Sequence, residues 1–136
     1  MTIPAVAYTD PEVAWVGMTE TRAEAEGVDY EKAVFPGAAS GRSLSIGRNE
    51  GLTKLLFAKA TGRLIDAGIV GTNAGELIAG ATLGIEMGAD AEDIALTIHS
   101  HPTLSETINF AAEVAEGTVT DLYVPREKEK ETVTTD

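Results

Sequence analysis

Cysteine is absent from this sequence of 136 residues. A chain without cysteine forms no disulfide, offers no thiolate to a metal and carries out no thiol chemistry with its own side chains. Aromatic residues are also scarce, at 5% of the sequence, although apolar residues reach 43%. The length suits one hydrophobic core, so we expect a single globular domain packed mainly from Ala, Val, Ile and Leu.

Positive charge is scarce as well. Ten Lys and Arg residues stand against 22 Asp and Glu residues, which gives a net charge of −12. This charge repels nucleic-acid phosphates and anionic membrane surfaces, so we expect neither as a partner. The acidity is typical either of a halophilic protein, whose self-repulsion is screened by high salt, or of an ordinary acidic domain.

Long apolar runs are missing too. No stretch of 18 apolar residues occurs, and the first residues do not place a basic segment before an apolar one. We therefore expect neither a transmembrane helix nor an export signal, and a cytoplasmic location is the default expectation.

Hydrophobic periodicity and turn residues divide the chain into extended segments followed by helices. Residues 59–62 end in glycine and separate two apolar runs, which predicts a β-hairpin. Strands before helices is the order of an α+β domain, in which helices cover an antiparallel sheet of about five strands. The predicted strands are residues 5–8, 13–16, 30–35, 52–58 and 63–70; the predicted helices are residues 20–26, 76–87, 91–97 and 104–116; residues 38–47 are predicted to cross irregularly.

The last residues differ in composition from the rest. Residues 126–136 are charged and have few apolar side chains, so we predict a disordered charged tail after a domain that spans residues 3–125. Neither the dinucleotide-binding pattern G-x-G-x-x-G nor a phosphate loop is present, so no motif predicts nucleotide binding by this chain.

Both histidines of the chain lie in residues 99–106, HSHPTLSE. A carboxylate beside a histidine holds one tautomer of the imidazole, so His101 with Glu106 could accept and return a proton. Pro102 disfavours helical backbone at His101, which presents the imidazole from a turn. The spacing from Thr103 to Glu106 is also that of a capping box, and spacing alone favours this structural interpretation.

His99 and His101 also form an H-x-H pair, which leaves a small metal-dependent hydrolase as an alternative. A catalytic metal usually needs a third protein ligand, and no acidic residue stands at a recognisable spacing. We therefore predict no metal site, and metal analysis of the purified protein tests the alternative.

Three segments, in order, resemble the dihydrolipoamide dehydrogenases, which are pyridine nucleotide-disulfide oxidoreductases. They are residues 9–17 (TDPEVAWVG), 69–78 (IVGTNAGELI) and 99–106 (HSHPTLSE). The resemblance is to the carboxy-terminal dimerisation domain of that family and runs from about residue 3 to 125. It departs from the usual pattern at two positions, because Thr72 stands where proline is common and Asp66 stands where glycine is common.

The resemblance implies a homodimeric flavoenzyme that uses FAD and NAD to oxidise dihydrolipoamide carried by the lipoyl domain of 2-oxoacid dehydrogenase complexes. It implies that His101, oriented by Glu106, acts as acid and base in the partner subunit's active site, beside a redox-active cysteine pair. His101 and Pro102 would also contact the flavin.

The same resemblance assigns the cysteine pair and the FAD- and NAD-binding domains to other parts of the parent chain. We therefore expect the 136 residues alone to be inactive, and the alternative is a self-association module with no activity of its own. Close-packed dimer surface is predicted from small residues, namely Gly80, Gly84, Ala111, Ala112 and Ala115.

Overall fold

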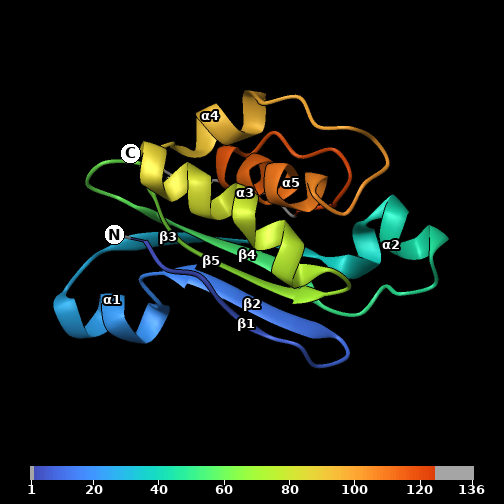
Figure 1. The fold of residues 1–136 in the computed structure, drawn as a ribbon. Helices are drawn as coiled ribbons and strands as arrows, with labels where there is room; N and C mark the ends of the chain where they lie inside the picture. The colour runs from blue at the N-terminus through green and yellow to red at the C-terminus, as the bar shows by residue number, and fades with distance from the viewer. Residues whose placement is uncertain (1, 125–136) are drawn as a thin grey trace, which may run out of the picture.

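The computed structural model describes residues 2–124 and contains a five-stranded antiparallel sheet (Figure 1). The order across the sheet is β1-β2-β5-β4-β3. The predicted α+β class and antiparallel sheet are confirmed, whereas the predicted tail at 126–136 lies outside the described residues. The strands are β1 (Ala5–Ala7), β2 (Glu12–Gly17), β3 (Tyr30–Pro36), β4 (Leu52–Ala58) and β5 (Leu64–Gly71).

Three helices cover one face of the sheet (Figure 1). Helix α3 packs on β1, β2 and β5, helix α5 packs on β3 and β4, and helix α4 packs on α5. Helix α1 lies on the opposite face, where Glu20 pairs with Lys54 of β4. The helices are α1 (Glu20–Glu26), the 3-10 turn η1 (Gly37–Ala39), α2 (Gly41–Ser45), α3 (Ala74–Met87), α4 (Ala91–Leu96) and α5 (Glu106–Glu116).

Locally encoded elements lie close to where the sequence places them. The predicted hairpin is confirmed, because β4 pairs with β5 in antiparallel register with Leu55 opposite Ala67. Helix α1 has the predicted bounds, with the Thr19 side chain accepting from a backbone amide at its start and Gly27 in left-handed conformation at its end.

Two predictions need correction. The segment predicted to cross irregularly contains the end of η1 and the whole of α2. Helix α2 begins there because the buried Ser40 caps it by accepting from the amide of Ser43 at 3.2 Å. Helix α5 begins at Glu106 rather than at residue 104. The amides of Thr107 and Ile108 bond to carbonyls only three residues back, which keeps the preceding residues in a tighter turn.

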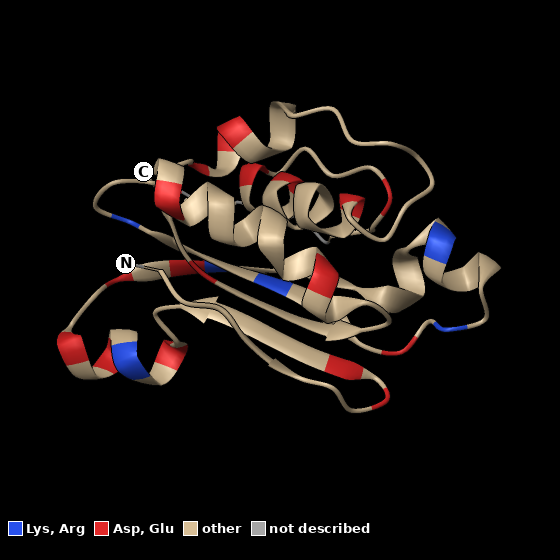
Figure 2. Ribbon diagram, viewed as in Figure 1, with Lys and Arg blue, Asp and Glu red and all other residues tan. Residues whose placement is uncertain are grey.

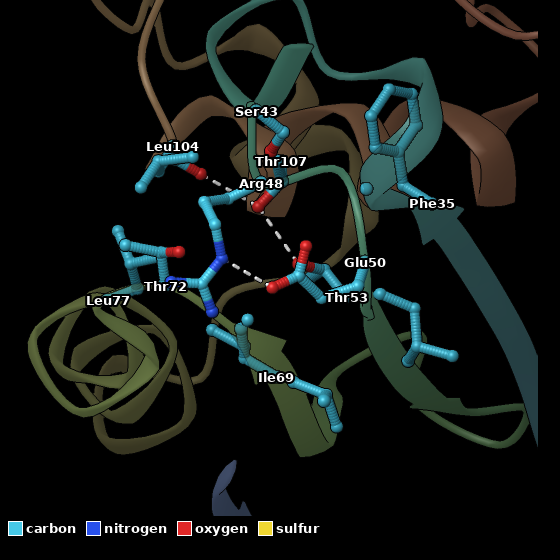
Figure 3. A pocket seen from close by; sticks show the side chains of 14 residues that line it. Phe35, Ser43, Arg48, Glu50, Thr53, Ile69, Thr72, Leu77, Leu104 and Thr107 are labelled. Carbon is cyan, nitrogen blue, oxygen red and sulfur yellow. Dashed lines mark hydrogen bonds and ion pairs between the residues drawn. The ribbon is translucent and has the colours of Figure 1, made fainter. Parts of the chain in front are cut away.

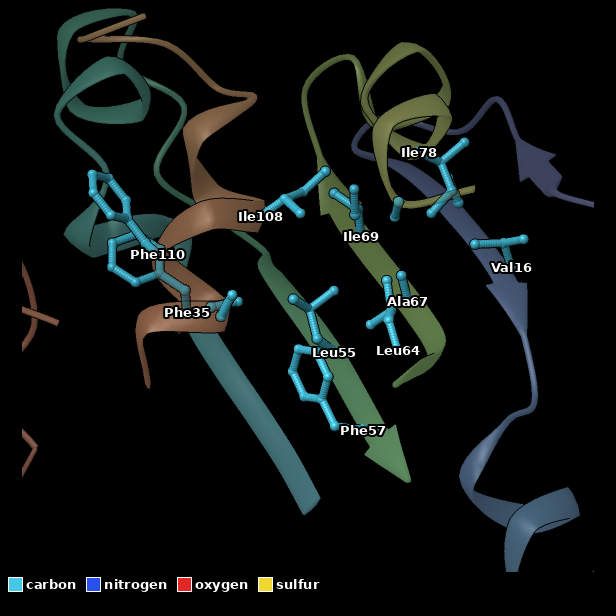
Figure 4. Packing of buried hydrophobic residues seen from close by; sticks show 14 of the residues in the cluster. Val16, Phe35, Leu55, Phe57, Leu64, Ala67, Ile69, Ile78, Ile108 and Phe110 are labelled. Atoms are coloured by element: carbon cyan, nitrogen blue, oxygen red, sulfur yellow. The ribbon is translucent and has the colours of Figure 1, made fainter. Parts of the chain in front are cut away.

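The core lies between the sheet and the helical layer (Figure 4). Side chains that alternate along the central strands point into it, as their period of two requires. Phe35 of β3 and Phe110 of α5 face each other with ring centroids 4.9 Å apart. Ala111 and Ala112 are completely buried in this core, so they are not available as the dimer surface that was predicted.

Two side-chain oxygens are buried without a hydrogen-bond partner within residues 2–124, and they belong to the two residues at which the sequence departs from the family pattern. They are Oδ1 of Asp66 and Oγ1 of Thr72. Burial raises the pKa of Asp66 to about 6, an effect that Lys54, with Nζ 3.6 Å from Oδ2, partly opposes.

Candidate functional site

Residues 97–105 connect α4 to α5 and carry both histidines. The imidazole of His99 donates from Nδ1 to the carbonyl of Thr97 at 2.8 Å, since a carbonyl oxygen only accepts. The imidazole of His101 faces Glu106 instead. The connection therefore directs its two histidines to different partners.

His101 and Glu106 form a close pair, called here the His–Glu pair. Nδ1 of His101 lies 2.9 Å from Oε1 and 3.0 Å from Oε2 of Glu106. The carboxylate is 4% exposed, whereas the imidazole is 67% exposed. An ionised carboxylate only accepts, so Nδ1 carries the hydrogen and Nε2 of the neutral ring is left as the free base.

The capping box that the spacing favours is formed only in part. Oγ1 of Thr103 accepts from the amide of Glu106 at 3.4 Å and donates to the carbonyl of Ser100 at 2.7 Å. The Glu106 carboxylate is directed to the imidazole, and Ser105, the residue before the helix, makes no side-chain cap hydrogen bond. Thr103 thus ties the peptide group before His101 to the start of the helix that carries Glu106.

Two buried hydroxyls anchor the first turn of α5 to the sheet (Figure 3). Oγ1 of Thr107 donates to the carbonyl of Leu104 at 2.8 Å and lies 2.9 Å from Oγ1 of Thr53 in β4. A hydroxyl has one hydrogen, so Thr107 accepts in the second contact and Thr53 donates. This link holds the residue next to Glu106 against β4 of the sheet.

The sequence analysis missed the role of Asn109, whose side chain binds backbone carbonyls at the end of α4. Its Nδ2 lies 3.0 Å from the carbonyl oxygen of Ile94, 2.8 Å from that of Ala95 and 3.4 Å from that of Thr97. The available signal was a polar residue in the apolar run from Ile108 to Ala112.

Pro102 is exposed next to the imidazole of His101, and the peptide bond between them is cis. Helix α2 lies beside this corner, because a Cβ built at Gly41 would lie 4.0 Å from Cβ of Pro102. The exposed surface of the site is therefore an imidazole and a proline ring, bordered by a short helix.

The described part of the chain holds no group of three His, Cys, Asp or Glu side chains that could bind a metal. Within the same residues, no helix has the length and apolar character that crossing a bilayer demands. The two histidines of the H-x-H pair therefore have no third ligand among residues 2–124.

The layer formed by α3, α4 and α5 is acidic, and from residue 64 to residue 124 the chain has no Lys or Arg (Figure 2). Its outer surface is also apolar in part. An open groove runs between α3 and α4, lined by Gly80, Leu83 and Met87 on one side and by Ile94 and His99 on the other. Leu83 is 64% exposed and Met87 77% exposed.

The family described as the pyridine nucleotide-disulphide oxidoreductase dimerisation domain matches residues 3–112. The chain is 60% identical over 128 residues to the dihydrolipoyl dehydrogenase of Vibrio cholerae, covering 94% of this chain and 27% of that protein. It is 50% identical over 115 residues to that of Bacillus subtilis, covering 85% and 24%. The chain thus spans about a quarter of the length of the curated relatives it matches.

Solved structures share the fold. The crystal structure of LpdA from Mycobacterium tuberculosis matches with a TM-score of 0.77 and 26% identity, covering 82% of this chain and 24% of that one. The HOCl-induced flavoprotein disulfide reductase RclA of Escherichia coli matches with a TM-score of 0.79 and 25% identity, covering 83% and 26%. The chain belongs to the pyridine nucleotide-disulphide oxidoreductase dimerisation domain family, and the predicted resemblance to dihydrolipoyl dehydrogenases is confirmed.

Proposed function

We propose that this chain is the dimerisation domain of a homodimeric dihydrolipoyl dehydrogenase and that it supplies the His–Glu pair to the active site of the partner subunit. The observation that carries the proposal is an exposed imidazole whose Nδ1 is held by a carboxylate that is itself only 4% exposed. This arrangement leaves Nε2 free to meet a group from outside the chain.

The pair has the properties of an acid–base catalyst for a thiol. Nε2 of His101 accepts the proton of one dihydrolipoyl thiol, and the thiolate then attacks one sulfur of a disulfide, which breaks the S–S bond and releases the other sulfur as a thiolate. The second dihydrolipoyl sulfur then displaces the first cysteine from the mixed disulfide, which leaves oxidised lipoamide and a reduced cysteine pair. The Glu106 carboxylate stabilises the imidazolium that results, and His101 releases this proton to solvent when the cycle closes. Since this chain has no cysteine, the disulfide belongs to another part of the enzyme.

The flavin contact belongs to the same proposal. Exposed imidazole and proline rings side by side at His101 and Pro102 suit a flat aromatic ring system, which gains from apolar contact and a hydrogen-bond donor or acceptor at its edge. FAD, bound by another domain, supplies the path for electrons from the dithiol to NAD. In this chain the two residues would limit access of water to that ring.

Self-association brings the His–Glu pair to its site. The apolar groove on α3 and the exposed Leu83 and Met87 are the surface that we assign to a second copy of the chain, because large apolar side chains gathered on one helix favour burial. Leu96 and Ile98, which are 72% and 97% exposed, extend this surface toward the histidines. The proposal further includes the lipoyl domain of a 2-oxoacid dehydrogenase complex as substrate carrier and a cytoplasmic location.

The test is His101→Gln in the full-length enzyme. General acid–base catalysis contributes about 10² to 10⁴ in rate, so we expect dihydrolipoamide turnover to fall by at least about 10²-fold while FAD stays bound. Glu31→Gln is the control, because Glu31 is exposed on β3 and lies outside both the connection that carries His101 and the groove between α3 and α4. Near-normal turnover of His101→Gln would remove the acid–base role.

A self-association module without activity of its own is the second candidate, favoured by the exposed apolar residues of α3. Sedimentation of the 136-residue chain, compared with Leu83→Asp and Met87→Asp variants, tests it. A dimer that both substitutions dissociate supports this surface, and a wild-type monomer at all concentrations contradicts it.

A further inference from the structure

Helix α5 carries Glu106 on its first turn and Asn109 three residues later. Residues three apart lie on the same side of a helix. Glu106 and Asn109 are 3% and 7% exposed, and both side chains reach back to the segment that precedes the helix. One holds the imidazole of His101, and the other holds the beginning of the connection that carries it.

The carbonyls that Asn109 binds stand at the end of α4. The last carbonyls of a helix lack the amide partners of an interior turn, so a buried side-chain amide that donates to them stabilises this end of α4. The carbonyl of Ile94 also accepts from the amide of Thr97 at 3.2 Å. Ile94 and Ala95 belong to the last turn, and Thr97 is the residue that ends the helix. An amide group has two hydrogens, so the contact with Thr97 at 3.4 Å is shared with one of the two shorter ones.

The carbonyl of Thr97 also accepts a hydrogen bond from Nδ1 of His99 at 2.8 Å. At the other end of the connection, Thr103 joins the carbonyl of Ser100 to the amide of Glu106. The backbone of the nine residues between α4 and α5 is thus tied to α5 on both sides of His101. The tie on the amino-terminal side is made by Asn109.

We propose that Asn109 is a positioning residue for His101 and that it keeps Nε2 where the thiol proton is delivered. This inference rests on the proposed acid–base role of His101. Without the Asn109 amide, the carbonyls at the end of α4 turn to water and the connection moves away from α5, while the Glu106 carboxylate stays on its helix.

Asn109→Leu in the full-length enzyme tests the proposal, since it keeps the branched shape of the side chain and removes both donors. A displacement of about 1 Å at a catalytic group costs up to about 10²-fold in rate, so we expect kcat for dihydrolipoamide oxidation to fall about 10-fold. The KM for NAD and the reduction of ferricyanide by NADH should stay within about twofold, because electron transfer from NADH through the flavin needs no proton from the dithiol.

The control is Ile78→Val, a core substitution on α3, which carries neither member of the His–Glu pair. A purely structural role for Asn109 would lower both activities in parallel, as loss of folded enzyme does, and that result overturns the proposal. An unchanged kcat for dihydrolipoamide overturns it as well. If Asn109→Leu does not fold, Asn109→Ser is measured in its place, since its shorter hydroxyl does not span the same carbonyls.

His101→Gln is measured alongside. If His101→Gln retains activity, the proposed function fails whatever Asn109 does. If His101→Gln is inactive and Asn109→Leu is normal, only the positioning role fails.

Discussion

The carboxylate of Glu106, buried at the start of α5, lies 2.9 Å from Nδ1 of His101, whose imidazole is two-thirds exposed. One member of the pair is therefore built into the core of this domain, and the other is presented to whatever lies outside it. A buried, charged hydrogen-bond acceptor is stronger and more strongly oriented than an exposed one.

Glu106→Gln separates charge from geometry. Glutamine offers a neutral oxygen to Nδ1, so the tautomer can be kept while the charge that stabilises the imidazolium is lost. We expect kcat/KM for dihydrolipoamide in the full-length enzyme to fall about 10²-fold. Glu113→Gln, on the same helix, is the control, and equal activities of the two variants would contradict a role for the charge.

Much of the fold follows from local signals in the sequence. Helix α1 is predicted to the residue because Thr19 and Gly27 act on adjacent backbone. The start of α5 is not, because the amides of Thr107 and Ile108 bond to carbonyls only three residues back, and the sequence pattern does not distinguish such a turn from the first turn of an α-helix. The role of the Glu106 side chain could not be predicted from spacing either, because a capping box and a contact with His101 need the same carboxylate.

Contacts between distant segments were beyond reach from the sequence. Asn109 binds carbonyls 12 to 15 residues earlier, and the pattern of α5 gives no reason to expect α4 beside it. The burial of Ala111 and Ala112 was missed for the same reason, since small residues on a helix suit either a core or a subunit contact.

The buried carboxyl group of Asp66 should make the stability of the domain depend on pH. Its pKa is raised from 3.8 to about 6 mainly by burial, with Lys54 opposing the shift and Glu20 adding to it. Because this pKa is raised, the folded state binds the proton more tightly than the unfolded state does. The contribution of protonated Asp66 to the free energy of unfolding is therefore fully present below about pH 4 and is lost as the pH rises through 6.

Urea unfolding of this chain at pH 5 and pH 7 tests that prediction. We expect Asp66→Asn to be more stable than the wild type at pH 7, by on the order of 2 kcal/mol, and this advantage to shrink at pH 5. Asp121→Asn, at a residue exposed to solvent, is the control. A stability difference for Asp66→Asn that does not change with pH would contradict the assignment.

The hydrogen bond between the hydroxyls of Thr53 and Thr107 should couple the effects of substitutions at these two positions on stability. Thr53→Val leaves Thr107 bonded to Leu104 but removes the donor from β4, and Thr107→Val removes both bonds. A double-mutant cycle should give a coupling of about 1 kcal/mol. Thr82→Val, whose hydroxyl donates only to its own helix, is the reference substitution, and additive effects of Thr53→Val and Thr107→Val would contradict the link.

The acidic composition predicts a response to salt. Screening of a net charge of −12 should raise the melting temperature as KCl increases to about 0.15 M, where the Debye length is about 8 Å. In a halophilic protein the steep rise continues toward molar KCl, whereas in an ordinary acidic domain it levels off. A series of melting temperatures measured from about 0.05 to about 3 M KCl separates the two interpretations. A melting temperature that does not change with KCl would contradict both.

Strand order has a consequence for how faults spread through the domain. Helix α5, which carries Glu106, rests on β3 and β4, whereas α3, which bears the exposed Leu83 and Met87, rests on β1, β2 and β5. Within the sheet, these halves meet where β5 pairs with β4. Damage to β3, β4 or α5 should therefore impair proton transfer while the subunits still pair, whereas damage to α3 should separate the subunits and thereby remove the His–Glu pair from the partner's active site as well.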